Sequence, residues 1–439
     1  MQQTLFFIPY EIFGIPVFGF GIALVLWVLV SLGVSWWVFR KNGSWKSEYT
    51  TNLLLALGVG VLAAFGFPKV GRMAGIPIQG YGTMMLLAIL CSLGLACLRA
   101  PKFGFTNNQV VEMALSMCIP GLIGARVFYV VEYWNEMVGE TAWQTLLNVL
   151  SFTEGGLVVY GSLFGGLLGG IAYLWWKKLS GLRMFDLMAP SMALGLALGR
   201  IGCFLNGCCF GGVCPADCQQ WGVHFPAGSP AFARQLEEHQ IWLHRDAFYY
   251  GMRFEADDFG MKIAEVQPGS LAEKHDVQAG DHVERLFGQA VTRPEDLIWK
   301  LVFGTRYEGC VDFELNRHGE TLARRWTTVA PAGPVSLAVY PTQLYSSANA
   351  FLLCCVVLIY SRLRRKPEGV GLKIDGEALA LTLTLYPISR FVLEMIRTDE
   401  TSFLHTGLSI SQNISILLLL ASLVFWGWLF WRARASKSA

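Results

Sequence analysis

The chain has 439 residues, of which 54% are hydrophobic and 15% are charged, and its mean hydropathy is +0.44. Soluble domains carry about 25% charged residues, so this composition excludes an ordinary soluble protein and places most of the chain in lipid. The formal net charge of +2 gives no argument for binding to nucleic acid. The fold class that we expect is a polytopic α-helical membrane protein.

Apolar runs long enough to cross a membrane, which takes about 17–25 residues each, occur about nine times along the chain. They lie near residues 15–39, 51–67, 81–98, 109–131, 156–176, 186–202, 343–360, 377–396 and 412–431. The second and sixth runs are the shortest. The sequence therefore predicts about nine spans.

Lysine and arginine are concentrated in every alternate connection between these runs. The segment Arg362–Lys366 is one such basic connection, whereas Glu132–Glu154 is acidic, and Lys69 and Arg72 are minor exceptions. The positive-inside rule then places the N-terminus outside and the C-terminus in the cytoplasm. We expect no cleaved signal peptide, because a basic first segment is lacking and the first apolar run continues too far.

The connection 203–342 has the composition of a soluble protein, and the topology places it outside the cytoplasm. Within it, residues 248–330 resemble a PDZ domain of the α+β class. The resemblance rests on a strand near Lys262–Val266, Gly-Ser before an apolar helix, Gly-Asp before a strand, a helix near Pro294–Phe303, a strand near Cys310–Asn316 and a hairpin at Arg317–Glu320. PDZ domains bind the ends of extended peptides by strand addition. Tyr250, Gly251 and Met252 are the candidate carboxylate-binding loop, and a purely architectural domain is the alternative.

The segment Leu198–Gly212 places an arginine, an asparagine, three cysteines and five glycines where an apolar run ends. Arg200 would lie near the bilayer boundary, where an unpaired guanidinium is costly and polar residues usually have a function. Glycines let the backbone approach a ligand closely, and the planar guanidinium suits a phosphate. The alternative is an arginine whose charged head simply reaches the membrane surface.

Five further motifs follow one another in a fixed order. They are Q-G-Y-G-T-M-M-L at 79–86, G-A-R-V-F-Y-V at 124–130, E-G-G-L-V-V-Y-G-S-L-F-G-G at 154–166, Y-P-T-Q-L-Y at 340–345 and Y-P-I-S-R-F-V-L-E-M-I-R at 386–397. Together with the 198–212 segment they resemble the prolipoprotein diacylglyceryl transferase family of the bacterial inner membrane. The resemblance predicts four parts: an extra N-terminal transmembrane pair at 1–77, a membrane core at 78–233 and 338–432, and the PDZ-like insert at 248–330.

The resemblance implies a reaction. Family members transfer the diacylglyceryl group of phosphatidylglycerol to the lipobox cysteine of a prolipoprotein signal peptide and release glycerol phosphate, without a cofactor. The catalytic residues that it implies are Arg200, Arg390, Tyr160, Tyr81 and Glu394. The substrate-binding residues that it implies are Arg126, Arg397, Asn206, Gly207, Gly211, Gln343 and Tyr345.

Arg390, Glu394 and Arg397 are spaced at i, i+4 and i+7 and so share one face of a predicted helix. Such a stripe inside a membrane requires mutual pairing or a ligand. Guanidinium groups grip a phosphate in a bidentate manner and favour its departure as an anion. The alternative is a buried pair that only holds helices together.

The chain departs from the family at the positions that matter most for the chemistry. Cys203 and Cys208 stand where the family has asparagine and glutamate, and Tyr160 and Tyr340 stand where it has histidine. An unperturbed phenol has a pKa near 10, so Tyr160 is a poor base. Either neighbouring arginines lower that pKa, or Glu394 or the substrate phosphate activates the thiol. We favour an orienting role for Tyr160.

Cysteine is unusually dense after the sixth run. Five cysteines fall within sixteen residues, and they are Cys203, Cys208, Cys209, Cys214 and Cys218. The spacing lacks the paired C-x-x-C of common zinc sites, so we expect no metal. In an oxidising compartment at least one disulfide is predicted, and the odd count leaves at least one thiol over.

Three other functions stay open at this stage. The first is transfer to another thiol or hydroxyl acceptor. The second is a catalytically inactive relative that binds anionic phospholipid and recruits a peptide or protein through its PDZ-like domain. The third, a transporter, is disfavoured because the arginines cluster toward the outer half and no inverted repeat is visible.

Overall fold

The structure is a computed structural model. It describes residues 4–19, 21–42, a few positions between 53 and 61, and residues 75–139, 141–150, 156, 158–241, 247–257, 260–291, 294–328, 335–367, 369–396 and 408–438. The chain divides into two compact units. The first, here the sheet-containing unit, combines Met1–Thr83 with Gly202–Pro341, and the second, here the helical unit, combines Met84–Ile201 with Thr342–Ala439. Each is described by itself.

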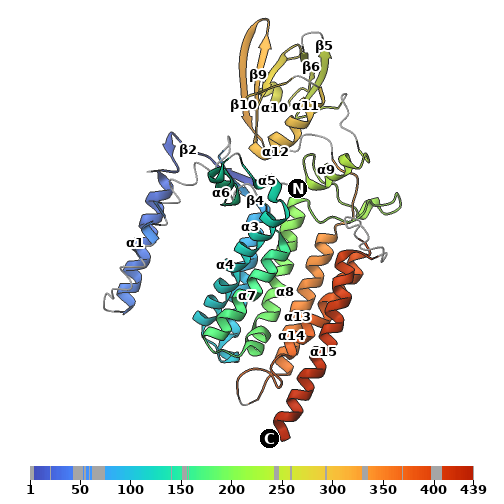
Figure 1. Cartoon of the computed structure of the whole chain (residues 1–439). Helices are drawn as coiled ribbons and strands as arrows, with labels where there is room; N and C mark the ends of the chain where they lie inside the picture. The colour runs from blue at the N-terminus through green and yellow to red at the C-terminus, as the bar shows by residue number, and fades with distance from the viewer. Residues whose placement is uncertain are drawn as a thin grey trace. The chain divides into compact units, whose positions relative to one another are not determined.

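The helical unit contains long apolar helices with short connections (Figure 1). They are α3 (Gly80–Arg99), α4 (Asn107–Glu132), α7 (Val159–Trp176), α8 (Gly181–Asn206), α13 (Thr342–Leu363), α14 (Glu377–Glu394) and α15 (Ile410–Ser438), of which α3 and α8 each extend a few residues past the unit. Three short elements connect them, η1 (Ala100–Phe103), α5 (Trp134–Met137) and α6 (Ala142–Leu150).

The expected apolar runs coincide with these helices. The first run overlaps α1 (Ile22–Asn42), and only the run 51–67 lies mostly outside the described residues. Among the described residues, five helices are long and apolar enough to cross a membrane: α3, α4, α8, α13 and α15. A helical membrane-protein architecture is therefore confirmed, while the number of nine spans stays a prediction.

Helices α4 and α7 lie side by side along a seam of glycines (Figure 1). A Cβ atom on Gly124 would lie 2.3 Å from the carbonyl oxygen of Gly161, and one on Gly161 would lie 2.2 Å from that of Gly124. A Cβ on Gly165 would likewise lie 2.2 Å from the carbonyl oxygen of Pro120. Small residues at such positions allow backbones to touch in a membrane. These glycines therefore serve helix packing.

The Gly181 end of α8 contains a fully bonded buried carboxylate. Asp186 is 0% exposed and accepts hydrogen bonds from the amides of Gly376, at 2.6 Å, and Leu379, at 3.0 Å. It thereby satisfies free N–H groups at the start of α14. Arg99 is also buried, and its guanidinium donates to the carbonyl oxygen of Leu187.

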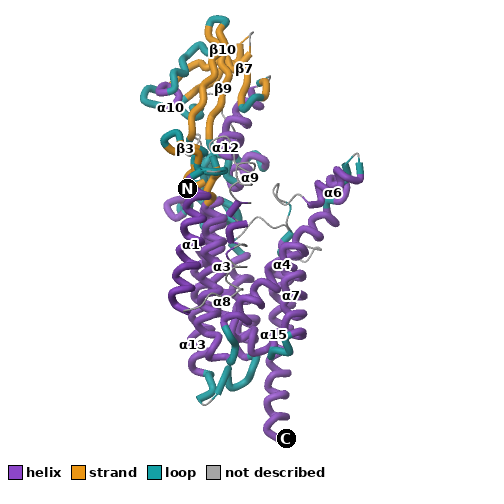
Figure 2. The backbone as a smooth tube through the Cα atoms, turned by 90° about the vertical axis from the view of Figure 1, so that its left-hand side faces the viewer, coloured by secondary structure: helices purple, strands orange, loops and turns teal. Residues whose placement is uncertain are grey.

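The sheet-containing unit has an antiparallel sheet (Figure 2) in the strand order β10-β9-β7-β6-β5. The strands are β5 (Met252–Asp257), β6 (Gly260–Val266), β7 (His282–Leu286), β9 (Cys310–Arg317) and β10 (Glu320–Thr327), and β8 (Gln289–Ala290) pairs with β7. The accompanying helical elements are α10 (Leu271–Lys274), α11 (Pro294–Trp299), the π-helical turn η3 (Lys300–Gly304) and α12 (Thr305–Glu308).

The predicted strands, helix and hairpin of this region are confirmed. Arg317 pairs with Glu320 across the hairpin, and the two residues between them have φ angles of 55° and 91°. The second of these is Gly319, which tolerates this left-handed backbone. A sheet-rich region is thus established, whereas its identity as a PDZ domain stays an interpretation.

The core of the sheet begins earlier in the chain than residue 248. Phe232 of α9 (Pro230–Glu237) is 1% exposed and belongs to the same buried cluster as Ile263 and Phe313. Just outside this cluster, Pro226 and Val335 form an antiparallel bridge. The chain therefore enters and leaves the sheet region at adjacent positions.

The N-terminal segment also contributes strands that the sequence did not predict. β1 (Thr4–Ile8) pairs antiparallel with β4 (Ile76–Gln79), and β2 (Glu11–Ile12) pairs with β3 (Ile15–Pro16). The ring of Phe7 lies so close to Gly309 that a Cβ there would clash with it. The segment before the first helix is therefore packed against the sheet region, within the same unit.

Candidate functional site

Arg200 lies in α8, less than two turns before the helix ends at Asn206, and its side chain is half-buried. Within the described part of the chain it makes no hydrogen bond and no ion pair. A guanidinium offers five N–H donors in a planar fork that matches a phosphate. An arginine with these donors unused at the end of an apolar helix is suited to receive an anionic ligand.

Arg390 and Glu394 form a buried ion pair within α14. The Nη1 atom of Arg390 lies 2.7 Å from Oε2 of Glu394, and the two side chains are 14% and 2% exposed. Arg390 also donates through Nη2 to the hydroxyl of Ser411 at the start of α15, at 3.0 Å. The predicted i, i+4 pairing is therefore present. Arg397, the third member of the predicted stripe, lies outside the described residues.

Arg126 of α4 is 6% exposed, and its guanidinium donates hydrogen bonds to backbone carbonyl groups. Its Nε, Nη1 and Nη2 atoms donate to the carbonyl oxygens of Val149, Gly156 and Asn148, at 2.9, 3.1 and 2.6 Å. These bonds tie the end of α6 to the segment that precedes α7. In this structure Arg126 thus positions a loop, and its expected contact with substrate would require these bonds to be exchanged.

Gly207 reverses the chain after α8. Its φ angle is 81°, and its amide donates to the carbonyl oxygen of Cys203 at 2.9 Å, as in a common helix C-cap. The next residues then pair with the segment that precedes α13, where the amide of Gly211 donates to the carbonyl oxygen of Tyr340 at 2.9 Å. The predicted glycines therefore bring two motifs together that lie far apart in the sequence.

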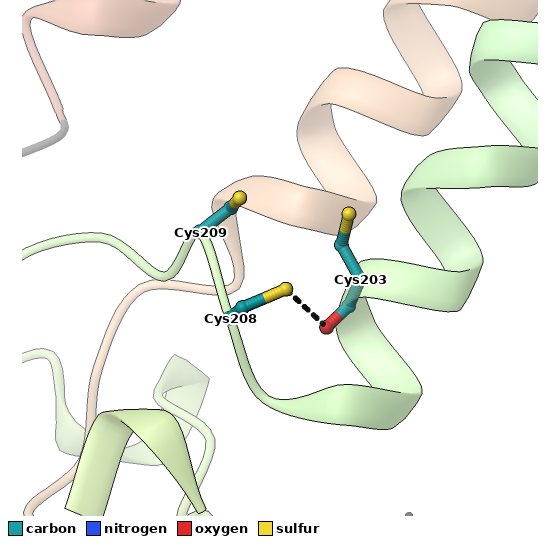
Figure 3. A group of neighbouring side chains, drawn as sticks. All are labelled: Cys203, Cys208 and Cys209. Carbon is teal, nitrogen blue, oxygen red and sulfur yellow. Dashed lines mark hydrogen bonds between the residues drawn. The ribbon is translucent and has the colours of Figure 1, made fainter. Parts of the chain in front are cut away.

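The same reversal gathers three thiols. The Sγ atoms of Cys203, Cys208 and Cys209 all lie within 4.8 Å of one another, and all three residues are half-buried (Figure 3). The thiol of Cys208 also points to the carbonyl oxygen of Cys203, with a sulfur–oxygen distance of 3.7 Å. All eleven cysteines of the chain are in the thiol form in this structure. The sequence predicted cysteine density here but not this convergence.

Comparison with known proteins identifies the family to which the chain belongs. A family model for prolipoprotein diacylglyceryl transferase matches residues 68–271 and 283–428. The chain belongs to the prolipoprotein diacylglyceryl transferase family.

Curated relatives extend this diacylglyceryl transferase match to nearly the whole chain. The phosphatidylglycerol–prolipoprotein diacylglyceryl transferase of Rhodopirellula baltica is 31% identical over 97% of this chain and 88% of its own length. Enzymes of the same name from Clostridium tetani and Clostridium perfringens are 33% and 31% identical over 33% and 37% of this chain, and over 55% and 60% of their own lengths. The first match includes the N-terminal segment and the sheet region.

Tyr160 and Tyr340, the two tyrosines predicted to replace family histidines, differ in their surroundings. Tyr160, at the start of α7, is 49% exposed and has no hydrogen-bonding partner among the described residues. The pKa of Tyr340 is raised from its ordinary value, chiefly by loss of solvent and further by Cys218, so this phenol is not suited to act as a base. Within α13, Gln343 is fully buried and Tyr345 is 38% exposed.

The remaining predicted residues lie in the sheet-containing unit. Tyr81 is 39% exposed in the first turn of α3, and Asn206 is the last residue of α8. Tyr250 and Gly251 occupy a tight turn with φ angles of 53° and 84°. The amide of Met252 donates to the carbonyl oxygen of Tyr249 at 3.0 Å, so this turn is closed on itself.

Proposed function

We propose that this protein transfers the diacylglyceryl group of phosphatidylglycerol to the lipobox cysteine of prolipoproteins. Family membership and the names of the relatives support this activity. The observation of this structure that carries it is Arg200, whose guanidinium has no partner within the described residues. A charge left unpaired at that depth is tolerable when a phosphate fills the place of the partner.

The reaction requires one bond to form and one to break. The acceptor sulfur attacks the glycerol carbon that bears the phosphate ester, the sulfur–carbon bond forms, and the carbon–oxygen bond breaks. Glycerol phosphate leaves with the electron pair, and the thiol proton passes to a base. Arg200 stabilises the negative charge on the departing phosphate, which is the usual way in which positioned cations lower such barriers.

The other residues have supporting roles in this proposal. Arg390 adds positive charge, and Glu394 holds its side chain in one orientation. Arg126 fixes the segment before α7 and thereby the backbone around Tyr160. Tyr160 donates a hydrogen bond that orients the phosphate or the acceptor, since its hydroxyl has no other partner among the described residues.

The topology is part of the same proposal. We propose that the protein lies in the bacterial cytoplasmic membrane with its N-terminus outside, its C-terminus in the cytoplasm and the sheet region outside the cytoplasm, and the basic connections support this orientation. Reporter fusions at residues 41, 178, 240 and 436 test this arrangement. Cytoplasmic reporter activity at 240, or external activity at 178, would contradict it.

For the sheet region we propose binding of a peptide end. Strand β5 forms one edge of the sheet and follows directly after the turn at Tyr250. An edge strand offers unpaired backbone groups to an added strand. Because the turn is closed, the carboxylate-binding loop must open when a peptide binds, which hydrogen exchange at the Met252 amide measures.

The activity is tested with purified protein, phosphatidylglycerol labelled in its acyl chains, and a lipobox peptide. We expect label on the peptide, and none on the same peptide with its cysteine replaced by serine. Binding of phosphatidylglycerol without transfer to either peptide would contradict the proposal and indicate an inactive relative. Equal transfer to the serine peptide would indicate a different acceptor chemistry.

A further inference from the structure

We propose that Cys203, Cys208 and Cys209 form a three-thiolate zinc site whose fourth position receives the acceptor thiol. This inference rests on the proposed transferase function, and it adds a metal cofactor to that site. It departs from the disulfide that the cysteine density predicts, because the structure brings three sulfur atoms together where a disulfide uses two.

The distances are close to those of a zinc site. Zinc–sulfur bonds measure about 2.3 Å, so sulfur atoms on a tetrahedral zinc lie about 3.8 Å apart. The three Sγ atoms lie within 4.8 Å of one another, so side-chain adjustments of about 1 Å complete the geometry. A disulfide requires about 2.05 Å between two sulfur atoms. The group of three is therefore nearer to a metal-binding arrangement than to a bonded pair.

The backbone holds the three residues together before any ion binds. Gly207 turns the chain back, and the amides of Gly207 and Cys208 both donate to the carbonyl oxygen of Cys203, at 2.9 and 3.2 Å. Cys209 has a φ angle of 57°, a left-handed conformation that non-glycine residues adopt rarely. Such backbone, when held by its surroundings, concentrates at functional sites.

The donor set selects the metal. Three thiolates are soft ligands that favour zinc or copper(I) over magnesium or calcium. A zinc ion with three protein ligands has an open fourth position, which is the arrangement of catalytic rather than structural sites. We commit to zinc, because its single oxidation state suits a transfer without electron exchange.

A zinc ion at this site would account at once for the tyrosine and the cysteine departures from the family. Tyr160 and Tyr340 stand where the resemblance places the family's histidines, and an ordinary phenol is a weaker base than imidazole near neutral pH. A thiol bound to zinc is deprotonated by the metal itself. The acceptor thiol loses its proton to solvent on binding, and the zinc-bound sulfur attacks the glycerol carbon. The carbon–oxygen bond breaks, glycerol phosphate leaves with the electron pair, and the thioether product releases the metal unchanged.

Arg200 precedes Cys203 by three residues on α8, so both lie on one face of that helix. One helix turn thus carries a phosphate-binding cation and a metal-binding thiolate. The two cysteines that replace the family's asparagine and glutamate, Cys203 and Cys208, are both members of the proposed site. The same substitutions that remove family polar groups therefore supply two of the three ligands.

The test is elemental analysis of the full-length protein, purified without reductant or chelator. We expect about one zinc ion per chain, and at least a tenfold loss of zinc in Cys203→Ser, Cys208→Ser and Cys209→Ser. Cys218→Ser and Cys118→Ser, which also remove single thiols but lie outside the group, are the matched controls and should keep it. Zinc-free wild-type protein, or a disulfide among the three residues in non-reducing mass mapping, overturns the proposal.

A second measurement reports the fourth position without depending on turnover. Protein loaded with cobalt(II) should show a thiolate-to-cobalt charge-transfer band that gains intensity when the lipobox peptide is added. The serine peptide should leave the band unchanged, and an equal response to both peptides overturns the open-position proposal. Zinc and a peptide response without transfer support the site and contradict the proposed function. Transfer by metal-free protein supports the function and contradicts the site.

Discussion

The charged residues at the two ends of α8 differ in their hydrogen bonding, although both ends belong to one continuous helix. At the Gly181 end, Asp186 accepts two backbone N–H groups and Arg99 donates to the carbonyl oxygen of Leu187. At the other end, Arg200 has no partner among the described residues. Asp186 is 0% exposed and both of its carboxylate oxygens accept hydrogen bonds, whereas Arg200 is half-buried.

The contrast separates charges that build the fold from charges kept for a ligand. A buried ion whose bonds are all made within the protein resists change, and its loss leaves other groups unsatisfied. A half-buried guanidinium without a partner contributes little to folding and offers its full set of donors to a phosphate. Four predictions follow this contrast, from the largest expected effect to the smallest.

Substitution of Arg200 should have the largest effect on activity and little effect on stability. Arg200→Lys keeps the charge but loses the planar fork, and should cost on the order of 1.5–3 kcal/mol of transition-state stabilisation, or about 10–150-fold in kcat/KM. Arg200→Ala should lose more. Transfer assays beside thermal unfolding in detergent measure both. Near-normal turnover by a folded Arg200→Ala protein would remove Arg200 from the site.

Asp186→Asn should show the reverse pattern. It keeps the shape of the side chain but removes the charge from two hydrogen bonds at the start of α14, which should lower the free energy of unfolding by about 1–3 kcal/mol. Activity per folded molecule should stay within about twofold of wild type, since Asp186 stabilises the fold and not the transition state. A twofold change corresponds to a barrier change well under 1 kcal/mol. A loss of turnover without a loss of stability would mean that both ends of α8 serve catalysis.

Tyr160→Phe should have a modest effect, because it deletes a hydroxyl whose only use is proposed to be an orienting hydrogen bond. A lost neutral hydrogen bond of about 0.5–1.5 kcal/mol lowers kcat/KM by about tenfold or less. A general base contributes about 10²–10⁴-fold. The pH profile decides between the two roles: if Tyr160 were the base, Tyr160→Phe would remove the limb at low pH together with several hundredfold of rate. Tyr160→His, which restores the family residue, is the complementary variant.

Removal of the sheet region should have the smallest effect on basal transfer. The bridge between Pro226 and Val335 indicates that residues 227–334 can be replaced by a short glycine linker. We expect transfer to small lipobox peptides to survive, with losses confined to a larger protein partner. Because Phe7 packs against this region, the N-terminal strands should become sensitive to proteolysis. Failure of the helices to fold would show that the region is part of the membrane core.

The elements that could be predicted from the sequence are those whose pattern lies within a few neighbouring residues. Apolar runs predicted the helices, and Arg317–Glu320 predicted the hairpin, because length, hydropathy and turn residues act within a few positions. The Arg390–Glu394 pair was predictable for the same reason, since helical spacing alone brings the two side chains together.

Features that depend on contacts between residues far apart in the sequence were not predicted. The acceptors of Arg126 are carbonyl oxygens, which every residue carries and no motif reveals. The sheet region begins before residue 248 because Phe232 completes a core formed far along the chain. The three thiols come together because the chain reverses at Gly207. The sequence contains this glycine but does not reveal which residues the reversal brings together.

The glycine seam between α4 and α7 has a consequence for how a phospholipid enters. Backbone contact at Gly124, Gly161 and Gly165 leaves no gap between the two helices at this level, so we expect them to form a wall that a phospholipid does not cross. A two-tailed substrate must therefore pass between other helices of the bundle. Gly161→Ala would force the wall apart from within, whereas entry through any other boundary should tolerate side chains of ordinary size.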